Sequence, residues 1–159
     1  MKKIALIGAI IVAVPLLVAA ANTGSVKYPD GYRSWTHVKS MVIHTDHGLA
    51  DPFEGIHHVY ANDAALVGLE SNRYPDGATL VFDLLNQEPG GGATQEGSRK
   101  FIGVMEYDAE RFSGTGGWGF EVFVGDSKDE RGVKDDGQSC FACHQAVKKD
   151  SYVFSKYRK

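Results

Sequence analysis

Alternating apolar and polar residues recur along this chain and predict a protein built mainly from β-strands. Five stretches fit a strand with two distinct faces: residues 34–44, 54–60, 78–86, 100–107 and 118–124. The third is the densest run of β-forming residues, so we predict that it is the central strand. In the last stretch Trp118 and Phe120 share one face while Phe123 lies on the other. Aromatic residues on both faces are expected where one face covers a core and the other a bound group.

The connections between these stretches predict few helices. Asn62 is a typical helix N-cap residue and precedes a short helical stretch at 63–70. The tetrapeptide Tyr-Pro-Asp-Gly occurs at 28–31 and again at 74–77, and it predicts two similar turns. A glycine-rich stretch at 88–98 is predicted to be a mobile loop. The whole pattern indicates an α+β fold dominated by β-strands, with a few short helices.

The start of the chain has the three parts of a secretory signal peptide. It begins Met-Lys-Lys, residues 4–18 are almost wholly apolar, and three alanines suited to cleavage follow at 19–21. An uncleaved membrane anchor is the alternative, but the apolar run is short for a membrane span. We therefore predict a signal peptide at 1–21 and a single exported domain at 22–159, with no membrane association after cleavage.

The charge of the chain is weakly acidic and excludes one class of function. Seventeen lysines and arginines stand against 20 aspartates and glutamates, a net charge of −3. Removal of the signal peptide takes two lysines with it and makes the exported domain more acidic. Basic residues cluster only at 148–149 and 156–159, so we do not expect the protein to bind nucleic acid.

The most specific chemical feature is the sequence Cys-Phe-Ala-Cys-His at 140–144, the attachment motif of a c-type haem. A helical turn brings Cys140 and Cys143 to one face, where both thiols add to the vinyl groups of one porphyrin. These are the only cysteines of the chain, so neither is left for a disulfide. His144 follows at once and is the predicted axial ligand of the iron. The motif predicts one covalently attached haem c, carried by a C-terminal helix.

Two other uses of the cysteine pair compete with haem attachment. A thioredoxin-like redox pair opens a helix after a strand in a βαβ unit, but too little chain follows Cys143 to complete one. A zinc site would need distant histidines as further ligands. Haem attachment accounts for all three residues of the motif. It also fits export, because c-type attachment takes place on the outer side of the bacterial inner membrane, so the predicted compartment is the periplasm.

The second axial position of the iron has few candidates in the sequence. No methionine follows His144, and the exported part keeps only Met41 and Met105, both in predicted strands where methionine usually fills core space. His57 and His58 point to opposite sides of their strand, so at most one of them faces the haem as a sixth ligand. A β-rich chain with a C-terminal haem motif is a narrow category.

Several segments in the same order resemble the cytochrome P-460 and cytochrome c′-beta family, over residues 28–159. They are Tyr-Pro-Asp-Gly-Tyr-Arg-Ser-Trp-Thr-His-Val-Lys-Ser at 28–40, Phe-Glu-Gly-Ile-His-His-Val-Tyr at 53–60, the run at 75–85, Gly-Gly-Trp-Gly-Phe at 116–120, and the haem motif. The resemblance implies a mainly antiparallel sheet, a haem with one axial histidine, and an open distal side that meets nitrogen oxides.

The family divides at one position, which Phe82 occupies in this chain. Members that oxidise hydroxylamine have there a lysine bonded to the porphyrin edge, in a motif like Asp-Gly-x-x-x-Val-Lys, and phenylalanine does not form that bond. The same members also have an acidic residue in the next strand. Its position aligns near Met105 of this chain, and Glu106 is the adjacent carboxylate. Cytochrome c′-beta members instead cap the distal face with two phenylalanines, and Phe53 and Phe82 match those positions. His57 stands where a family oxidase has an arginine, so it is predicted to border the pocket.

The resemblance therefore favours a mono-haem cytochrome with a five-coordinate iron that binds nitric oxide or another small gas and is able to relay electrons. An apolar cap offers no hydrogen-bond donor to dioxygen, whereas nitric oxide binds ferrous haem without one. The alternative is an oxidoreductase acting on hydroxylamine or nitric oxide. Electron relay implies a redox partner protein, and the sequence leaves the oligomeric state open, a homodimer included.

Overall fold

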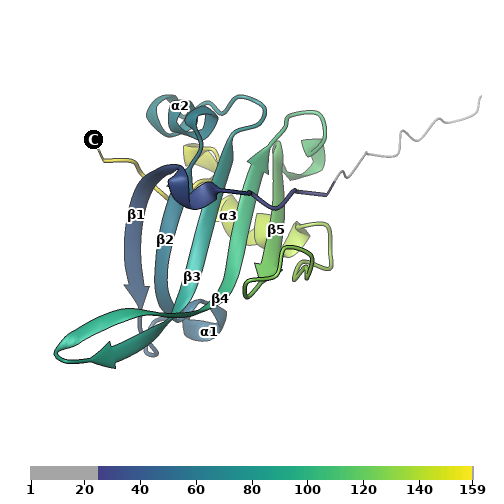
Figure 1. The fold of residues 1–159 in the computed structure, drawn as a ribbon. Helices are drawn as coiled ribbons and strands as arrows, with labels where there is room; N and C mark the ends of the chain where they lie inside the picture. Colours follow the sequence, from purple (N-terminus) through teal and green to yellow (C-terminus); the bar gives the residue numbers. More distant parts are fainter. Residues whose placement is uncertain (1–24, 159) are drawn as a thin grey trace, which may run out of the picture.

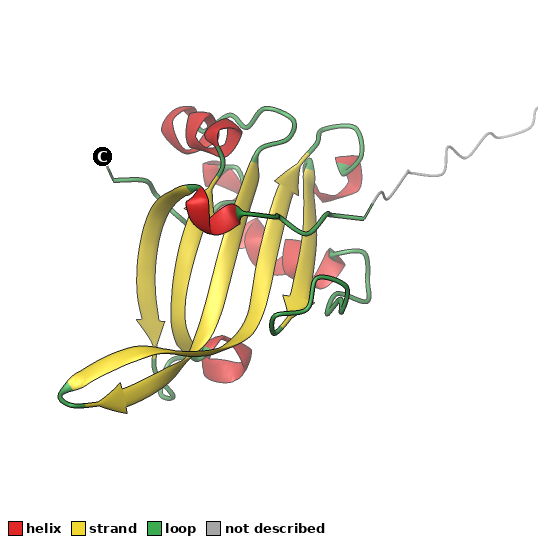
Figure 2. Cartoon of the chain, in the orientation of Figure 1, coloured by secondary structure: helices red, strands yellow, loops and turns green. Residues whose placement is uncertain are grey.

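The computed structural model describes residues 25–158 and contains one antiparallel β-sheet flanked by short helices (Figures 1 and 2). The five strands lie side by side in chain order. They are β1 (Thr36–Ile43), β2 (Gly55–Ala61), β3 (Thr79–Gly90), β4 (Ala93–Tyr107) and β5 (Trp118–Val124). This order makes β3 the central strand, as predicted, and leaves β1 and β5 at the two edges. The predicted β-dominated fold is confirmed, while the predicted signal peptide at 1–21 lies outside the described residues.

Short helical segments fill the connections. The α-helices are α1 (Ala50–Phe53), α2 (Asp63–Ser71) and α3 (Gln138–His144), and the 3-10 helices are η1 (Tyr32–Ser34), η2 (Ser113–Thr115) and η3 (Gln145–Asp150). The predicted N-cap of α2 is confirmed, because the Asn62 side chain accepts a hydrogen bond of 2.9 Å from the backbone N–H of Ala65. Within residues 25–158 no helix is long and apolar enough to cross a membrane.

The prediction of a mobile loop at 88–98 is wrong. β3 and β4 continue through this stretch as a two-stranded hairpin that projects beyond the other strands (Figure 1). Gly91 and Gly92 form its turn with left-handed φ values of 59° and 79°, which suit a two-residue hairpin turn. The polar segments on either side of the turn form strands because they pair with one another. Local composition does not reveal such pairing.

The two faces of the sheet are covered by different parts of the chain. One face, which we call the α3 face, packs Val59, Leu80 and Phe120 beneath α2 and the C-terminal segment that includes α3. The other, the N-terminal face, packs Ile102 and Phe123 beneath residues 25–35, which cross in front of the sheet in Figure 1. As predicted from the pattern of the last strand, aromatic side chains of β5 are therefore buried on both sides.

The two methionines predicted to fill the core have different surroundings. Met105 packs against the core of the α3 face. Met41 is 41% exposed, so its prediction as core filler is wrong. The reason is its position on β1, since an edge strand has a neighbour on one side only.

Candidate functional site

The two cysteines are presented by α3. The helix begins after Gly137, whose φ is 81°, and Asp135 accepts a hydrogen bond of 2.9 Å from the Ser139 backbone N–H at its first turn. Cys140 is half-buried and Cys143 is exposed, and both are free thiols. Their spacing of three residues puts them on the same side of the helix. Burial raises the pKa of the Cys140 thiol.

His144 ends the helix with one of its ring nitrogens already engaged. Its Nδ1 lies 2.7 Å from the backbone carbonyl oxygen of Tyr152. A carbonyl only accepts, so Nδ1 carries the proton and Nε2 presents a lone pair. Burial lowers the pKa of His144, which keeps the imidazole neutral. Histidine ligates iron as a neutral imidazole, with one ring nitrogen held by a hydrogen bond and the other free to bind the metal.

Main-chain geometry places the Tyr152 carbonyl against His144. Ser151 and Tyr152 both have left-handed φ values, 53° and 65°, so the chain reverses after η3. The indole N–H of Trp118 donates to the Ser151 carbonyl at 2.9 Å and ties this turn to β5. Gly116 allows the close approach, because a Cβ there would lie 2.6 Å from the Tyr152 ring.

A second set of hydrogen bonds ties the same turn to the end of α2. The Asn72 side chain donates to the Lys149 carbonyl at 2.9 Å, and the Ser151 hydroxyl donates to the Asn72 carbonyl at 2.7 Å. Asn72 is the left-handed residue that ends α2. An asparagine after a helix is a recognisable signal for such an end. The carbonyl of Tyr152 has no residue-type signal, and sequence reasoning missed it.

An aromatic cluster occupies the α3 face at the end nearer α1. Phe82 projects from β3, and its ring centroid lies 6.0 Å from that of Phe53, the last residue of α1, in an edge-to-face arrangement. The ring of His57 on β2 lies 4.3 Å from that of Phe82. The structure therefore brings together the three residues predicted for the distal side. It adds Phe101 of β4, whose ring lies 6.1 Å from Phe82 and which only alternation along residues 100–107 would have indicated.

His57 is the titratable member of the aromatic cluster. It is 3% exposed, and burial, with smaller effects from Lys39 and His58, lowers its pKa to about 4. Within residues 25–158 its Nδ1 is buried without a hydrogen-bond partner. His58 lies on the opposite face, where Nδ1 is 2.7 Å from the Ser40 hydroxyl, which confirms that the two histidines point to opposite sides of β2.

The acidic residue predicted next to Met105 also lies away from the aromatic cluster. Glu106 follows Met105 on β4 and so points to the N-terminal face. There its carboxylate oxygen lies 2.6 Å from Nη1 of Arg111. The α3 face thus receives the thioether side chain and not the carboxylate.

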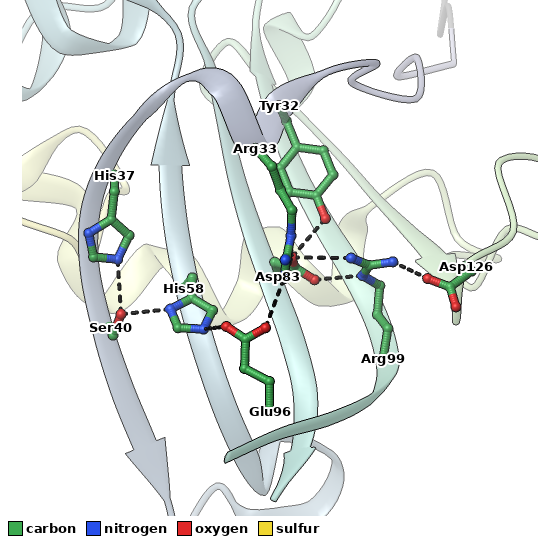
Figure 3. Close-up of polar contacts among 9 residues, drawn as sticks. All are labelled: Tyr32, Arg33, His37, Ser40, His58, Asp83, Glu96, Arg99 and Asp126. Carbon is green, nitrogen blue, oxygen red and sulfur yellow. Dashed lines mark hydrogen bonds and ion pairs between the residues drawn. The ribbon is translucent and has the colours of Figure 1, made fainter. Parts of the chain in front are cut away.

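Directly behind Phe82, the N-terminal face holds a network of charged side chains around Asp83 (Figure 3). The carboxylate is fully buried and accepts hydrogen bonds from the Tyr32 hydroxyl at 2.7 Å, Arg33 Nε at 2.9 Å and Arg99 Nε at 2.7 Å. Burial alone would raise the pKa of Asp83, but these hydrogen bonds outweigh it and hold the pKa below its ordinary value. Every oxygen is satisfied within the protein, so the network fixes β3 against its neighbours.

The residues on the α3 face fit a haem. They comprise two free thiols on one side of a helix, a neutral imidazole with Nε2 available, and an apolar cluster with an unpartnered buried nitrogen on the same face of the sheet. The Phe120 ring lies 5.0 Å from that of His144, and Phe82 packs against the core cluster to which Phe120 belongs. Within residues 25–158 no three His, Cys, Asp or Glu side chains group to hold a metal ion, so the zinc alternative lacks its ligands.

The fold and this arrangement define a haem-binding cytochrome. The family comparison agrees, because the model of the family described as Cytochrome P460 matches residues 29–155, most of the chain. The chain belongs to the cytochrome P460 family. No curated protein gives a significant match to it.

Proposed function

We propose that this protein is a periplasmic c-type cytochrome that binds nitric oxide or another small gas. Its haem is attached through Cys140 and Cys143, with His144 as the only protein ligand of the iron. The observation that carries the proposal is the pairing of Phe53 and Phe82, edge to face, on the same face of the sheet as His144. When bound, haem supplies an iron with an open sixth position that takes diatomic gases.

The aromatic pair favours a diatomic gas, which needs no hydrogen bonds, over water. Neither ring has a polar atom, so a water molecule beneath them would lose its hydrogen bonds at a substantial cost in free energy. The His57 ring stacks against the Phe82 ring, with the two rings inclined by 31°. It therefore backs the Phe82 ring and remains neutral at neutral pH, because its pKa is about 4.

Oxidation of hydroxylamine, the alternative function, finds less support in these residues. That reaction requires proton transfer by groups beside the substrate. Phe82 occupies the position at which the hydroxylamine-oxidising members have a lysine, and Glu106 pairs with Arg111 on the other face. Gas binding is the better proposal. Cys143 is exposed, so the haem edge bonded to it would lie at the protein surface. This position supports electron exchange with a partner protein.

The proposal is tested first by covalent attachment. Protein produced with a c-type maturation system should have an intact mass equal to that of the processed chain plus one haem. The haem should resist acid–acetone extraction, and Cys140→Ala/Cys143→Ala should lose it. His144→Ala is the matched comparison, because it should keep the covalent haem and change the spin state. Free extraction of haem from the wild type would contradict the assignment.

A further inference from the structure

A cleft of about 490 Å³ opens between β1 and the C-terminal residues that follow η3. It is lined by residues 38–41 of β1 and by Phe154, Lys156 and Arg158. Its volume is in the range of small-molecule sites. Among the lining residues, the charged ones are Lys39, Lys156 and Arg158, all cationic, and none is an aspartate or glutamate. The cleft is thus lined by both apolar and cationic side chains and carries positive charge.

These three cations have no carboxylate partner among the residues that the structure describes. Within residues 25–158 neither Lys39, Lys156 nor Arg158 forms an ion pair, although other basic side chains of this chain do, such as Arg99 with Asp83. This local excess of positive charge contrasts with the chain as a whole, whose net charge is −3. Cations that converge on one cleft concentrate positive potential there and attract an anion. Lysine and arginine bind carboxylates through charge-assisted hydrogen bonds.

The cleft borders both halves of the candidate haem site. Phe154 lines it, and the Phe154 ring lies 5.0 Å from the ring of His144. Met41 lines it from β1 and pairs with His57 in the β1–β2 register. One side of the cleft therefore adjoins the axial ligand and the other adjoins the aromatic cluster.

The cleft also lies across the sheet from the cysteines. α3 packs over β5, where the ring of Phe141 lies 6.5 Å from that of Phe120. The cleft is on β1, at the opposite edge of the five-stranded sheet. A porphyrin bonded through its vinyl groups has its two propionate carboxylates on the other side of the ring. Anchoring at α3 therefore directs the carboxylates toward β1.

We propose that this cleft binds the propionate carboxylates of the haem, with Lys39, Lys156 and Arg158 as their partners. The proposal rests on the attachment at Cys140 and Cys143 proposed above. It gives the C-terminal residues a function, since 154–158 then close the haem site by ion pairing and not by apolar packing alone. The other titratable groups beside the cleft are His57 on β2 and the axial ligand His144.

The test is the pH dependence of the midpoint potential of the haem-loaded protein. Opposite charges lower a carboxyl pKa by about 1–3 units. In Lys39→Gln/Lys156→Gln/Arg158→Gln the carboxylate inflection should therefore move to higher pH by about one unit or more. The matched control is Lys27→Gln, which removes an exposed lysine from the N-terminal face and should leave the curve unchanged. Lys156→Arg, which keeps the charge, should also behave as the wild type.

The single variants Lys156→Gln and Arg158→Gln keep the test valid if the triple variant fails to mature, because both side chains lie in the exposed tail. Each should show part of the shift. A haem-loaded triple variant, or both single variants, with the wild-type curve would overturn the proposal. A saturable response of the wild-type potential to sulfate at constant ionic strength, lost in the variants, would overturn it too by showing a cleft open to free anions. If the wild-type protein has no covalent haem, as its intact mass would show, the proposed function is contradicted and not the propionate proposal alone.

Discussion

Phe82 separates the two functions considered for this protein at the scale of a single residue. Its ring has contacts on three sides, with Phe53, His57 and Phe101, and it remains half-buried. A ring held in this way covers the α3 face without being locked into a core. We therefore expect it to act as a lid through which a gas reaches the iron.

Phe82→Ala should raise the association rate of nitric oxide. If displacement of the ring contributes about 1.4 kcal/mol to the entry barrier, the rate rises about tenfold, as stopped-flow mixing would show. The loss of stability should be smaller than the roughly 3–5 kcal/mol typical of a fully buried phenylalanine. Phe123→Ala is the control, because Phe123 is fully buried on the other face and should lose stability with unchanged kinetics. A wild-type association rate in Phe82→Ala would end the lid hypothesis.

His57 should make the folded protein sensitive to mild acid. Its pKa is about 4 in the folded state, against about 6.5 in the unfolded chain. The unfolded state thus binds more protons between these values, so stability is lost as the pH falls from about 6.5 toward 4. Between pH 7 and pH 5 the expected loss in the free energy of unfolding is about 2 kcal/mol.

Denaturant titrations at the two pH values measure this loss. His57→Leu should remove most of the difference, whereas His44→Leu, at an exposed position, should keep it. Equal acid sensitivity in the wild type and His57→Leu would show that other groups govern the pH dependence.

The candidate site residues that could be predicted from the sequence are those recognised by side-chain type and by spacing along the chain. Cys140, Cys143 and His144 follow from their motif, while the family resemblance indicated Phe53, Phe82 and His57. The Tyr152 carbonyl that orients His144 was not predictable, because every residue has a carbonyl and only the left-handed turn at 151–152 selects this one.

At the scale of elements, β3 joins the two faces of the sheet, with Phe82 on one and Asp83 on the other. Asp83→Asn should therefore destabilise the fold without altering ligand binding. Breaking a fully buried ion pair typically costs about 3–5 kcal/mol, and the cost here should be somewhat smaller because Asp83 is fully buried whereas its partners Arg33 and Arg99 are 44% and 16% exposed. Asp126→Asn, which removes an 80% exposed partner of Arg99, should cost less than about 1 kcal/mol. Thermal and denaturant melts compare the two, and losses of similar size would contradict a stabilising network around Asp83.

Element prediction from sequence succeeded where hydrophobic alternation is strong and failed in the hairpin of β3 and β4. Outside that hairpin, the five strands were placed correctly within about two residues because one or both of their faces are buried there, whereas β4 begins at Ala93 and not at 100. Residues 88–98 are largely exposed and polar, so they lack that signal. Their strand structure comes from pairing with each other, which depends on the Gly91–Gly92 turn and on the register of the inner strands.

In the whole molecule, the proposed haem lies between a helix at one edge of the sheet and a cationic cleft at the other edge. The axial histidine is oriented by a main-chain carbonyl on one side, and an aromatic cluster covers the other side. We propose that the iron of the haem-loaded protein has one protein ligand and an open, apolar sixth position.

The absorption spectrum of the purified ferrous protein, recorded before and after addition of nitric oxide, is the most direct test. We expect the spectrum of an ordinary high-spin, five-coordinate c-type haem, with a clear change when nitric oxide is added. A low-spin, six-coordinate ferrous spectrum that nitric oxide does not alter would contradict this expectation and point to His57 as a second ligand. A strongly red-shifted Soret band would contradict it as well, by indicating a porphyrin modified as in the hydroxylamine-oxidising members.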